Sequence, residues 1–473
     1  MEKSGKRIVS IKVVLCILVV SFFFLSLLPL LYVARYDLPF GDDMMFYKES
    51  AKTWNETGNL GAVFQVAVET TRSGYVNWQG TYFPIFMLCF QPAVFSLSLY
   101  SLTPWIMLLL LIASSLFTGY VILIRYLQLN AIDWILIVFT ALLFQIQLLP
   151  DIKEGFFWYN TALLYTASYC YALFLVGFLM LSLIVKSSLG RLASLLAAAI
   201  FVVAVAGGAV SLILPMLFLV LSIFLRDVVK RNKRGIISTG FILILMIVGS
   251  VINLSAPGNA IRIAFEHDYY GSHGLSALDA IMQSVINGAL FTAKHTDFAM
   301  IVFLGVWIAS FHRLLNKMKI RFYHPAIVFI LTFGLFCMQF TPMLFSLASI
   351  GPPRIQNVIF FSLYWFWAGN VFNTVGWIHQ KKKVSLYLPL TNDPIEKGVL
   401  NWNVFARKAI LILTVFFSFC AFIQRDGGLY ANPSVQALSE LHSGISKEHY
   451  EQRLAELQGD SINEVSVESK ILP

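Results

Sequence analysis

A series of long apolar runs, repeated along most of the sequence, constrains this chain more than any other feature. A helix of about 20 residues crosses roughly 30 Å of hydrocarbon, and a chain inside lipid must satisfy its own backbone hydrogen bonds. Of the 473 residues, 58% are hydrophobic and only 12% are charged. The apolar surface therefore exceeds what a soluble core of this size buries, and the sequence predicts an all-α, polytopic transmembrane helical bundle.

Apolar runs long enough to span a bilayer occur at roughly eleven places. The expected spans are 8–33, 103–124, 132–149, 161–185, 192–205, 212–225, 236–254, 298–312, 326–345, 358–378 and 409–423. The first follows a basic tip but lacks a small-x-small cleavage site, so we interpret it as a retained helix. The stretch from Tyr82 to Tyr100 is also apolar, and counting it as a span would invert the topology up to Arg226. Either it is re-entrant or interfacial, which we favour, or 192–225 is one broken helix.

The net charge of +9 comes from basic residues in short clusters between apolar runs, at Lys3 to Arg7, Arg226 to Arg234 and Lys381 to Lys383. The tendency of cytoplasmic loops to be positive explains this pattern better than a nucleic-acid surface does. No nucleic-acid partner is expected, and membrane lipids are. The N-terminus is then cytoplasmic, in what we expect to be a bacterial cytoplasmic membrane.

With this orientation, residues 1–424 form one transmembrane module with a large first outer loop. The outer loops are 34–80, 254–296 and 346–356. Residues 425–473 form a short, polar extracytoplasmic tail, which contains one amphipathic helical pattern near 435–457.

Three carboxylates, Asp37, Asp42 and Asp43, follow the first apolar run within about two helical turns of the membrane surface. Carboxylates at this depth are costly unless they serve a ligand, a metal or a proton. A carboxylate beside an apolar wall also has a raised pKa, as a general base requires. Alternatively, Asp42 or Asp43 only caps a helix that starts at Met44. We expect one of the two to be catalytic.

Polar and aromatic side chains gather in three other places outside the spans. They include Trp78, Gln79, Glu154, Trp158, Tyr159, Asn160 and Asn259, which we take as candidate substrate-binding residues. Tryptophan and tyrosine also favour the membrane interface for physical reasons alone, so an aromatic belt is the alternative for Trp78. The alternative for Glu154 is pairing with a charged neighbour.

Two arginines, Arg262 and Arg354, follow turn sequences in the expected outer loops. Arginine on the outer face runs against the positive-inside tendency, and a guanidinium binds phosphate oxygens in a bidentate manner. Both are therefore candidates for an anionic head group, unless they only snorkel to lipid phosphates. The sequence contains no glycine-rich phosphate loop and no His/Cys ligand cluster, so no cofactor or metal is expected.

The motifs FGDDMMF, NWQGTYF followed by Gln91-Pro92, EGFFWYN and APGNAIR resemble a widespread bacterial family of multispanning proteins linked to surface polysaccharide synthesis. The chain also resembles the GT-C superfamily of glycosyltransferases, and the likeness covers most of 30–375. The resemblance implies that Asp42 or Asp43 is the general base, and that Arg262 and Arg354 hold the phosphate of a polyprenyl-phosphate donor. It makes aromatic residues platforms for sugar rings, namely Trp78, Trp158 and Tyr159. Met44 follows the aspartates where an extended acidic cluster would stand, which leaves a divalent metal unsupported.

The expected function is transfer of a sugar from a polyprenyl-phosphate donor to a cell-surface glycan or lipid acceptor, at an extracytoplasmic active site. A transporter or flippase of lipid-linked saccharides is the main alternative, and a polymerase or ligase of such saccharides is another. The expected spans are nearly free of charge, whereas a transporter places ionisable residues at mid-membrane. This difference favours chemistry at the surface over passage through the bilayer.

Overall fold

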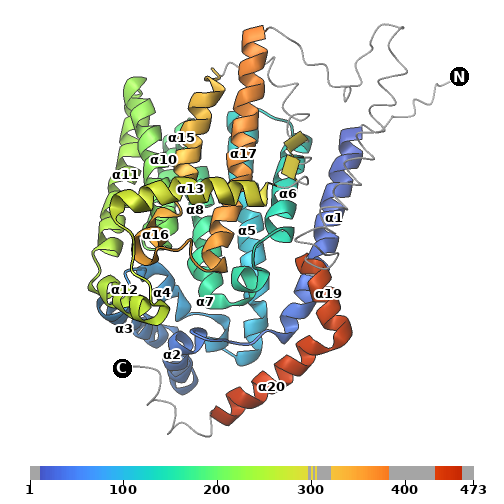
Figure 1. Ribbon diagram of the computed structural model, residues 1–473, viewed down its shortest axis with the longest axis vertical. Helices are drawn as coiled ribbons and strands as arrows, with labels where there is room; N and C mark the ends of the chain where they lie inside the picture. Colours follow the sequence, from blue (N-terminus) through green and yellow to red (C-terminus); the bar gives the residue numbers. More distant parts are fainter. Residues whose placement is uncertain (1–10, 297–299, 302–303, 306–320, 383–431, 461–473) are drawn as a thin grey trace, which may run out of the picture.

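The computed structural model describes residues 11–296, 300–301, 304–305, 321–382 and 432–460, and within them every regular element is helical (Figure 1). The longer helices of the bundle are α1 (Ile11–Val33), α5 (Thr103–Gly119), α6 (Ala131–Gln147), α8 (Ser168–Ile184), α9 (Ser188–Ala206), α10 (Val210–Val229), α11 (Lys233–Leu254), α15 (Pro325–Cys337) and α17 (Pro353–Lys382). Flanking helices are α2 (Asp43–Thr57), α3 (Leu60–Asn77), α4 (Tyr82–Leu88), α7 (Tyr159–Thr161), α12 (Pro257–Tyr270), α13 (Ala277–His295), α16 (Thr341–Leu347), α19 (Pro433–Ser443) and α20 (Ile445–Asp460). The all-α prediction is confirmed for the described part of the chain.

Seven helical stretches are long and apolar enough to cross a membrane, and the bent pair α15 and α16 would add an eighth. The seven are Val13–Tyr36, Leu97–Tyr126, Tyr159–Ile184, Ser188–Ala206, Val210–Val229, Lys233–Leu254 and Pro353–Lys381. These are the features of a multi-pass membrane protein. The expected count of eleven is not reached: α6 has only 17 residues, and the runs at 298–312 and 409–423 lie largely or wholly outside the described residues.

The apolar stretch from Tyr82 to Tyr100 does not form a long helix. It consists of α4, with seven residues, and two short 3₁₀ turns, η2 (Pro92–Val94) and η3 (Leu97–Leu102). Seven residues rise only about 10 Å, too little to cross the hydrocarbon. Residues 188–229 instead form two separate candidate spans. The re-entrant or interfacial alternative therefore agrees with the structure, and a single broken helix over 192–225 is wrong.

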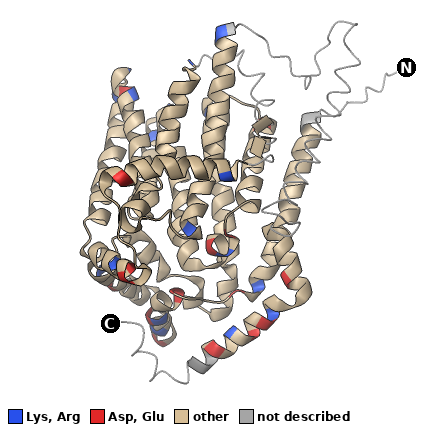
Figure 2. Ribbon diagram, in the orientation of Figure 1, with Lys and Arg blue, Asp and Glu red and all other residues tan. Residues whose placement is uncertain are grey.

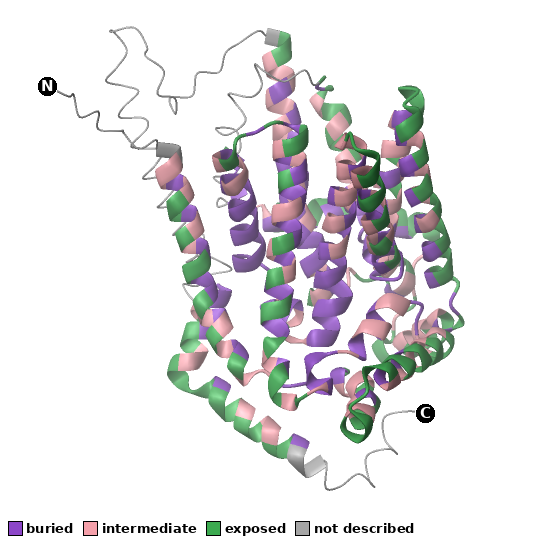
Figure 3. Cartoon of the chain, turned by 180° about the vertical axis from the view of Figure 1, so that it is seen from behind, coloured by how far each residue is buried: buried purple, intermediate pink, exposed green. Residues whose placement is uncertain are grey.

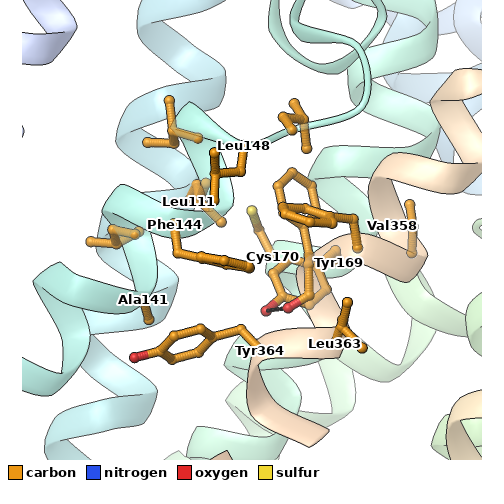
Figure 4. Packing of buried hydrophobic residues seen from close by; sticks show 14 of the residues in the cluster. Leu111, Ala141, Phe144, Leu148, Tyr169, Cys170, Val358, Leu363 and Tyr364 are labelled. Atoms are coloured by element: carbon orange, nitrogen blue, oxygen red, sulfur yellow. Dashed lines mark hydrogen bonds between the residues drawn. The ribbon is translucent and has the colours of Figure 1, made fainter. Parts of the chain in front are cut away.

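At the centre of the bundle, aliphatic and aromatic side chains from helices far apart in the sequence pack together (Figure 4). The ring centroid of Phe144 on α6 lies 5.1 Å from that of Phe360 and 5.4 Å from that of Tyr364, both on α17. Tyr169 on α8 accepts a hydrogen bond from Trp365 Nε1 at 2.8 Å. Within lipid, close packing and interhelical hydrogen bonds hold helices together. These contacts pack α6 and α8 against α17.

Charged side chains of the described residues are sparse between the ends of the long helices (Figure 2). We call the end where α1 stops at Val33 and α17 begins at Pro353 the site end. The opposite end carries Lys186, Lys233 and Lys381 at or beside helix termini. Figure 3 shows exposed residues along the flanks of the bundle, and many of them are large apolar residues, as expected of a surface that faces lipid.

Two of the predicted outer loops are mostly helical. The first loop, 34–80, contains α2 and α3, which join where Gly58 takes a left-handed φ of 59° and Asn59 Oδ1 caps α3 through Gly61 N at 2.8 Å. The loop 254–296 contains α12 and α13, and α13 lies across the long helices against α15 and α16 (Figure 1). Amphipathic patterns in both loops allow these helices to pack on the bundle.

The C-terminal tail forms two helices, where one was expected, because Gly444 adopts a left-handed φ of 76° between α19 and α20. Its first residues are buried against the bundle. Ser434 Oγ donates to the carbonyl oxygen of Ser26 on α1 at 2.5 Å, and Asn432 Nδ2 donates to that of Gln147 on α6 at 3.1 Å. The tail is thus fastened to the site end of two bundle helices.

Candidate functional site

A polar cavity of about 80 Å³ lies at the site end and is lined by segments from five parts of the sequence. Its lining residues are Asp42, Met45, Phe46, Trp78, Gln79, Asn160, Thr161, Leu164, Tyr165, Arg262 and Arg354. Six of these were predicted as site residues. The other five stand one or two helical turns beyond Asp42 and Asn160, or directly beside Asn160, so helical spacing from the predicted residues was the signal that could have found them.

Asp42 is exposed and faces the polar cavity. It stands at the N-cap of α2, but its side chain makes no capping hydrogen bond, so the capping alternative is wrong for this residue. The preceding Gly41 has φ of 54°, and a Cβ there would lie 3.0 Å from the Trp158 ring. A tight, left-handed turn against an indole therefore directs Asp42 into the cavity.

Asp43, by contrast, is completely buried and does not line the cavity. Its carboxylate accepts hydrogen bonds from Tyr100 Oη at 2.5 Å, Asn160 N at 2.8 Å and Phe40 N at 3.2 Å. Burial raises the pKa of Asp43 to about 6, although these three hydrogen bonds lower it. Asp43 thus ties the first outer segment to the turn before α8, and its predicted catalytic role has no support from its position.

Asp37 lies beside Asp43. Its Oδ2 atom is buried without a hydrogen-bond partner, and burial together with the charge of Asp43 holds the pKa of Asp37 well above its usual range. We call Asp37, Asp43 and Tyr100 the carboxylate cluster. Burial raises the pKa of both acids, so the negative charge that this cluster brings beside the polar cavity depends on pH.

Arg262, on α12, is held at the cavity by three side chains. Its Nε donates to Glu266 Oε1 at 2.8 Å, its Nη1 donates to Gln79 Oε1, and its guanidinium carbon lies 5.8 Å from the centroid of the Trp78 ring. The predicted residues of the second and fourth motifs therefore meet in space. Both Trp78 and Gln79 line the cavity and orient the arginine beside it.

The two motifs meet through glycines that allow backbones to approach closely. A Cβ on Gly80 would lie 1.8 Å from the carbonyl oxygen of Asn253, and one on Gly258 would lie 2.4 Å from Trp78 N. Asn259 Oδ1 accepts a hydrogen bond from Gly80 N at 2.8 Å. Asn259 therefore joins these two segments by a hydrogen bond. It does not line the cavity, so the substrate contact predicted for it has no support from its position.

Arg354, in the first turn of α17, is paired with Glu154. The two oxygens of Glu154 accept from Arg354 N at 2.6 Å and from its Nη1 at 3.3 Å, and the Trp158 ring centroid lies 5.8 Å from the guanidinium carbon. Glu154 is thus a countercharge for an arginine 200 positions away, which agrees with the pairing alternative.

Trp158 and Tyr159, the two predicted sugar platforms after Glu154, do not line this cavity. Trp158 packs against Phe40, with ring centroids 5.5 Å apart, and does not line the cavity. Tyr159 is 5% exposed, and its backbone N–H donates to Tyr100 Oη at 3.0 Å. Both residues follow the π-helical turn η5 (Lys153–Phe157), after which Tyr159 is buried and Trp158 is partly buried, a difference that aromatic composition alone does not reveal.

An apolar cavity of about 480 Å³ lies further into the bundle, between α5, α8, α10, α15 and α17. Both cavities have lining residues on α17, and residues from the consecutive elements η6 (Ala162–Ala167) and α8 line one each. On α17, Arg354 lines the polar cavity and Ser362 the apolar one, a separation of about 12 Å along the helix. On the other side, Tyr165 and Tyr169 are about one turn apart. The two cavities therefore follow one another along α17 and along the chain from η6 into α8.

No protein-family model, no curated protein and no solved structure matches this chain. The resemblance to GT-C glycosyltransferases stays a prediction. Among the described residues, no group of three or more His, Cys, Asp or Glu side chains is placed to hold a metal ion.

Proposed function

We propose that this protein is a membrane glycosyltransferase that moves a sugar from a polyprenyl-phosphate donor to a cell-surface glycan or lipid. The observation that carries the proposal is the meeting of one carboxylate, Asp42, with two arginines, Arg262 and Arg354, around a single polar cavity. A general base beside cations that bind phosphate is the pair of functions that this reaction needs.

The two arginines would bind the donor phosphate. Each guanidinium has five N–H donors, and the contacts to Glu266, Gln79 and Glu154 use only some of them. The remaining N–H groups can donate hydrogen bonds to phosphate oxygens from two sides. As the sugar leaves the phosphate, negative charge grows on the leaving group, so cations that are already oriented stabilise the transition state more than the bound donor.

Asp42 would act as the base. The acceptor hydroxyl attacks the anomeric carbon, the bond from that carbon to the phosphate oxygen breaks, and Asp42 takes the hydroxyl proton. Within the described residues the Asp42 carboxylate has no hydrogen-bond or ion-pair partner, so it is free to accept this proton. Trp78 and Tyr165, which also line the cavity, offer aromatic faces to a sugar ring.

The apolar cavity supports a lipid-linked donor. Its lining is almost entirely aliphatic and aromatic, and it begins about 12 Å along α17 from Arg354. An isoprenoid chain could occupy it while the phosphate stays at the arginines. The sparse charge of the long helices fits a substrate whose carrier remains within the lipid.

The distribution of cations supports the proposed orientation, with the site outside a bacterial cytoplasmic membrane. Lys186, Arg191, Lys233 and Lys381 all lie at the end of the bundle opposite the polar cavity. Cytoplasmic ends of multi-pass proteins are rich in such residues.

A polymerase or ligase of lipid-linked saccharides is the second candidate, because paired outward arginines serve it equally well. It would use Arg262 and Arg354 without requiring a base at Asp42. A transporter or flippase has less support, since the described long helices carry few ionisable residues at mid-length.

The experiment is a transfer assay on the purified full chain. Radiolabelled synthetic polyprenyl-phosphate sugars are offered with cell-envelope acceptor to the wild type, to Asp42→Asn and to Asp268→Asn, whose exposed carboxylate lies on α12 outside the cavity. We expect Asp42→Asn to slow transfer by roughly 10²–10⁴-fold and the control to match the wild type. Absence of transfer from every donor would reject the proposal, and full activity of Asp42→Asn would favour the ligase.

A further inference from the structure

A second polar cavity, of about 310 Å³, lies at the site end between the end of α1 and the turn from α19 to α20. We call it the tail cavity. Tyr32, Arg35 and Tyr36 line it from α1 and the 3₁₀ turn η1 (Ala34–Tyr36), while His442 and Lys447 line it from the tail. Its volume is at the lower limit of typical ligand sites, about 300 Å³. It is separate from the polar cavity, with which it shares no lining residue.

The tail cavity carries an excess of positive charge. The guanidinium carbon of Arg35 lies 3.7 Å from the centroid of the Tyr32 ring and 4.6 Å from that of Tyr36, and no carboxylate pairs with it among the described residues. Among the described lining residues, Glu440 is the one acidic residue and forms a partly exposed ion pair with Lys153 Nζ at 3.5 Å, so Arg35 and Lys447 leave the lining with a net positive charge. Arg35 is therefore oriented by aromatic rings and left without a countercharge.

Lys447 adds to this charge. It pairs with Glu451 at 3.5 Å, but both side chains are about two-thirds exposed, at 66% and 64%. An exposed pair one helical turn apart is worth little and exchanges readily with another anion. Lys447 and Arg35 thus approach the cavity from its two sides as available cations.

Large apolar side chains on α1 are exposed along one face, and this apolar stripe ends about one turn before Arg35. Ile17, Phe24, Leu28 and Tyr32 are each 50% to 58% exposed and recur at helical spacing on one face. From Ile17 to Tyr32 the stripe is about 22 Å long. In a membrane such a face contacts acyl chains, so whatever occupies the tail cavity is presented together with a hydrocarbon surface.

We propose that the tail cavity binds the phosphate head group of an anionic phospholipid, whose acyl chains lie along the α1 stripe. The guanidinium of Arg35 would take phosphate oxygens in a bidentate manner, and Lys447 would add a point charge from the tail. The bound lipid would link α1 to the turn between α19 and α20. The proposal is independent of the proposed transferase activity.

Native mass spectrometry of the purified full chain tests the proposal, with phosphatidylglycerol and phosphatidylcholine of identical acyl chains offered together. We expect the wild type to retain phosphatidylglycerol preferentially. Arg35→Gln combined with Lys447→Gln should lower that retention by roughly fivefold for each cation removed. The matched control is Lys52→Gln combined with Arg72→Gln, which removes two exposed cations from α2 and α3 at the same end.

Equal retention of the two lipids by the wild type, or an equal loss in the control pair, would overturn the proposal, since it would show unspecific attraction. Inorganic phosphate is titrated as a separate arm. If it displaces phosphatidylglycerol at matched concentration, the ligand is free phosphate and the lipid assignment is wrong. Lys447→Gln alone changes only an exposed side chain, so it decides the question if the Arg35 variant fails to fold.

Discussion

The carboxylate cluster and the polar cavity lie side by side at the same end of the bundle, and the neighbours Asp42 and Asp43 belong one to each. Asp43 is buried and receives three hydrogen bonds, whereas Asp42 is exposed and shares a cavity with two arginines. Consecutive residues of a helix point about 100° apart, so adjacent carboxylates at the start of α2 reach different environments. A carboxylate that holds segments together is saturated by donors, and one available for chemistry is not.

Exchange of each carboxylate for its amide should show the largest effect. Asp42→Asn should lose roughly 10²–10⁴-fold in transfer rate with an unchanged melting temperature. Asp43→Asn should instead lose about 1–3 kcal/mol of stability, because the new NH₂ group faces donors such as Asn160 N. Both variants are assayed in the same detergent for transfer rate and for melting temperature. If Asp43→Asn has the melting temperature of the wild type, Asp43 does not have the structural role that distinguishes it from Asp42.

The pH dependence of stability should sharpen the comparison further. The pKa of Asp43 is raised from 3.8 to about 6, so folding favours the protonated form. The stability it contributes is complete below pH 4 and is lost as the pH rises through 6. Asp37, whose pKa is also raised, acts in the same direction.

Melting temperature measured between pH 4 and 7 tests this. The wild type should melt at progressively lower temperature as the pH rises, and Asp43→Asn should show a shallower slope. Asp42→Asn is the control and should keep the slope of the wild type. A slope that is steepest in Asp43→Asn would contradict the burial of this carboxylate as the cause.

The smallest expected effect is on donor affinity. Arg262→Lys and Arg354→Lys keep the charge but lose the planar guanidinium, so the KM for the donor should rise by about tenfold in each, with a smaller change in kcat. The control is Arg453→Lys, since Arg453 pairs with Glu456 at 2.8 Å on α20, away from the cavity. An unchanged KM in both cavity variants would show that the two arginines do not bind the donor.

Much of the site could be predicted from local patterns, because charged and polar residues next to apolar spans are costly to place at the membrane surface unless they have a function. Arg262, Arg354, Trp78 and Gln79 were found in this way and meet at one cavity. Tyr159 was predicted to face a sugar, but it is buried after the π-helical turn η5 and does not line the cavity.

The sequence by itself determined the class of molecule, because the length and apolar content of its runs leave helices in lipid as the stable arrangement. Only the tertiary structure decided between Asp42 and Asp43, and only it paired Glu154 with Arg354 across 200 positions. A hydrophobic run shows which residues lie in lipid. It does not show which way each side chain points around its helix, or which distant residues it contacts. Those depend on how α6, α8 and α17 pack, and packing is a property of side-chain shapes that no local pattern records.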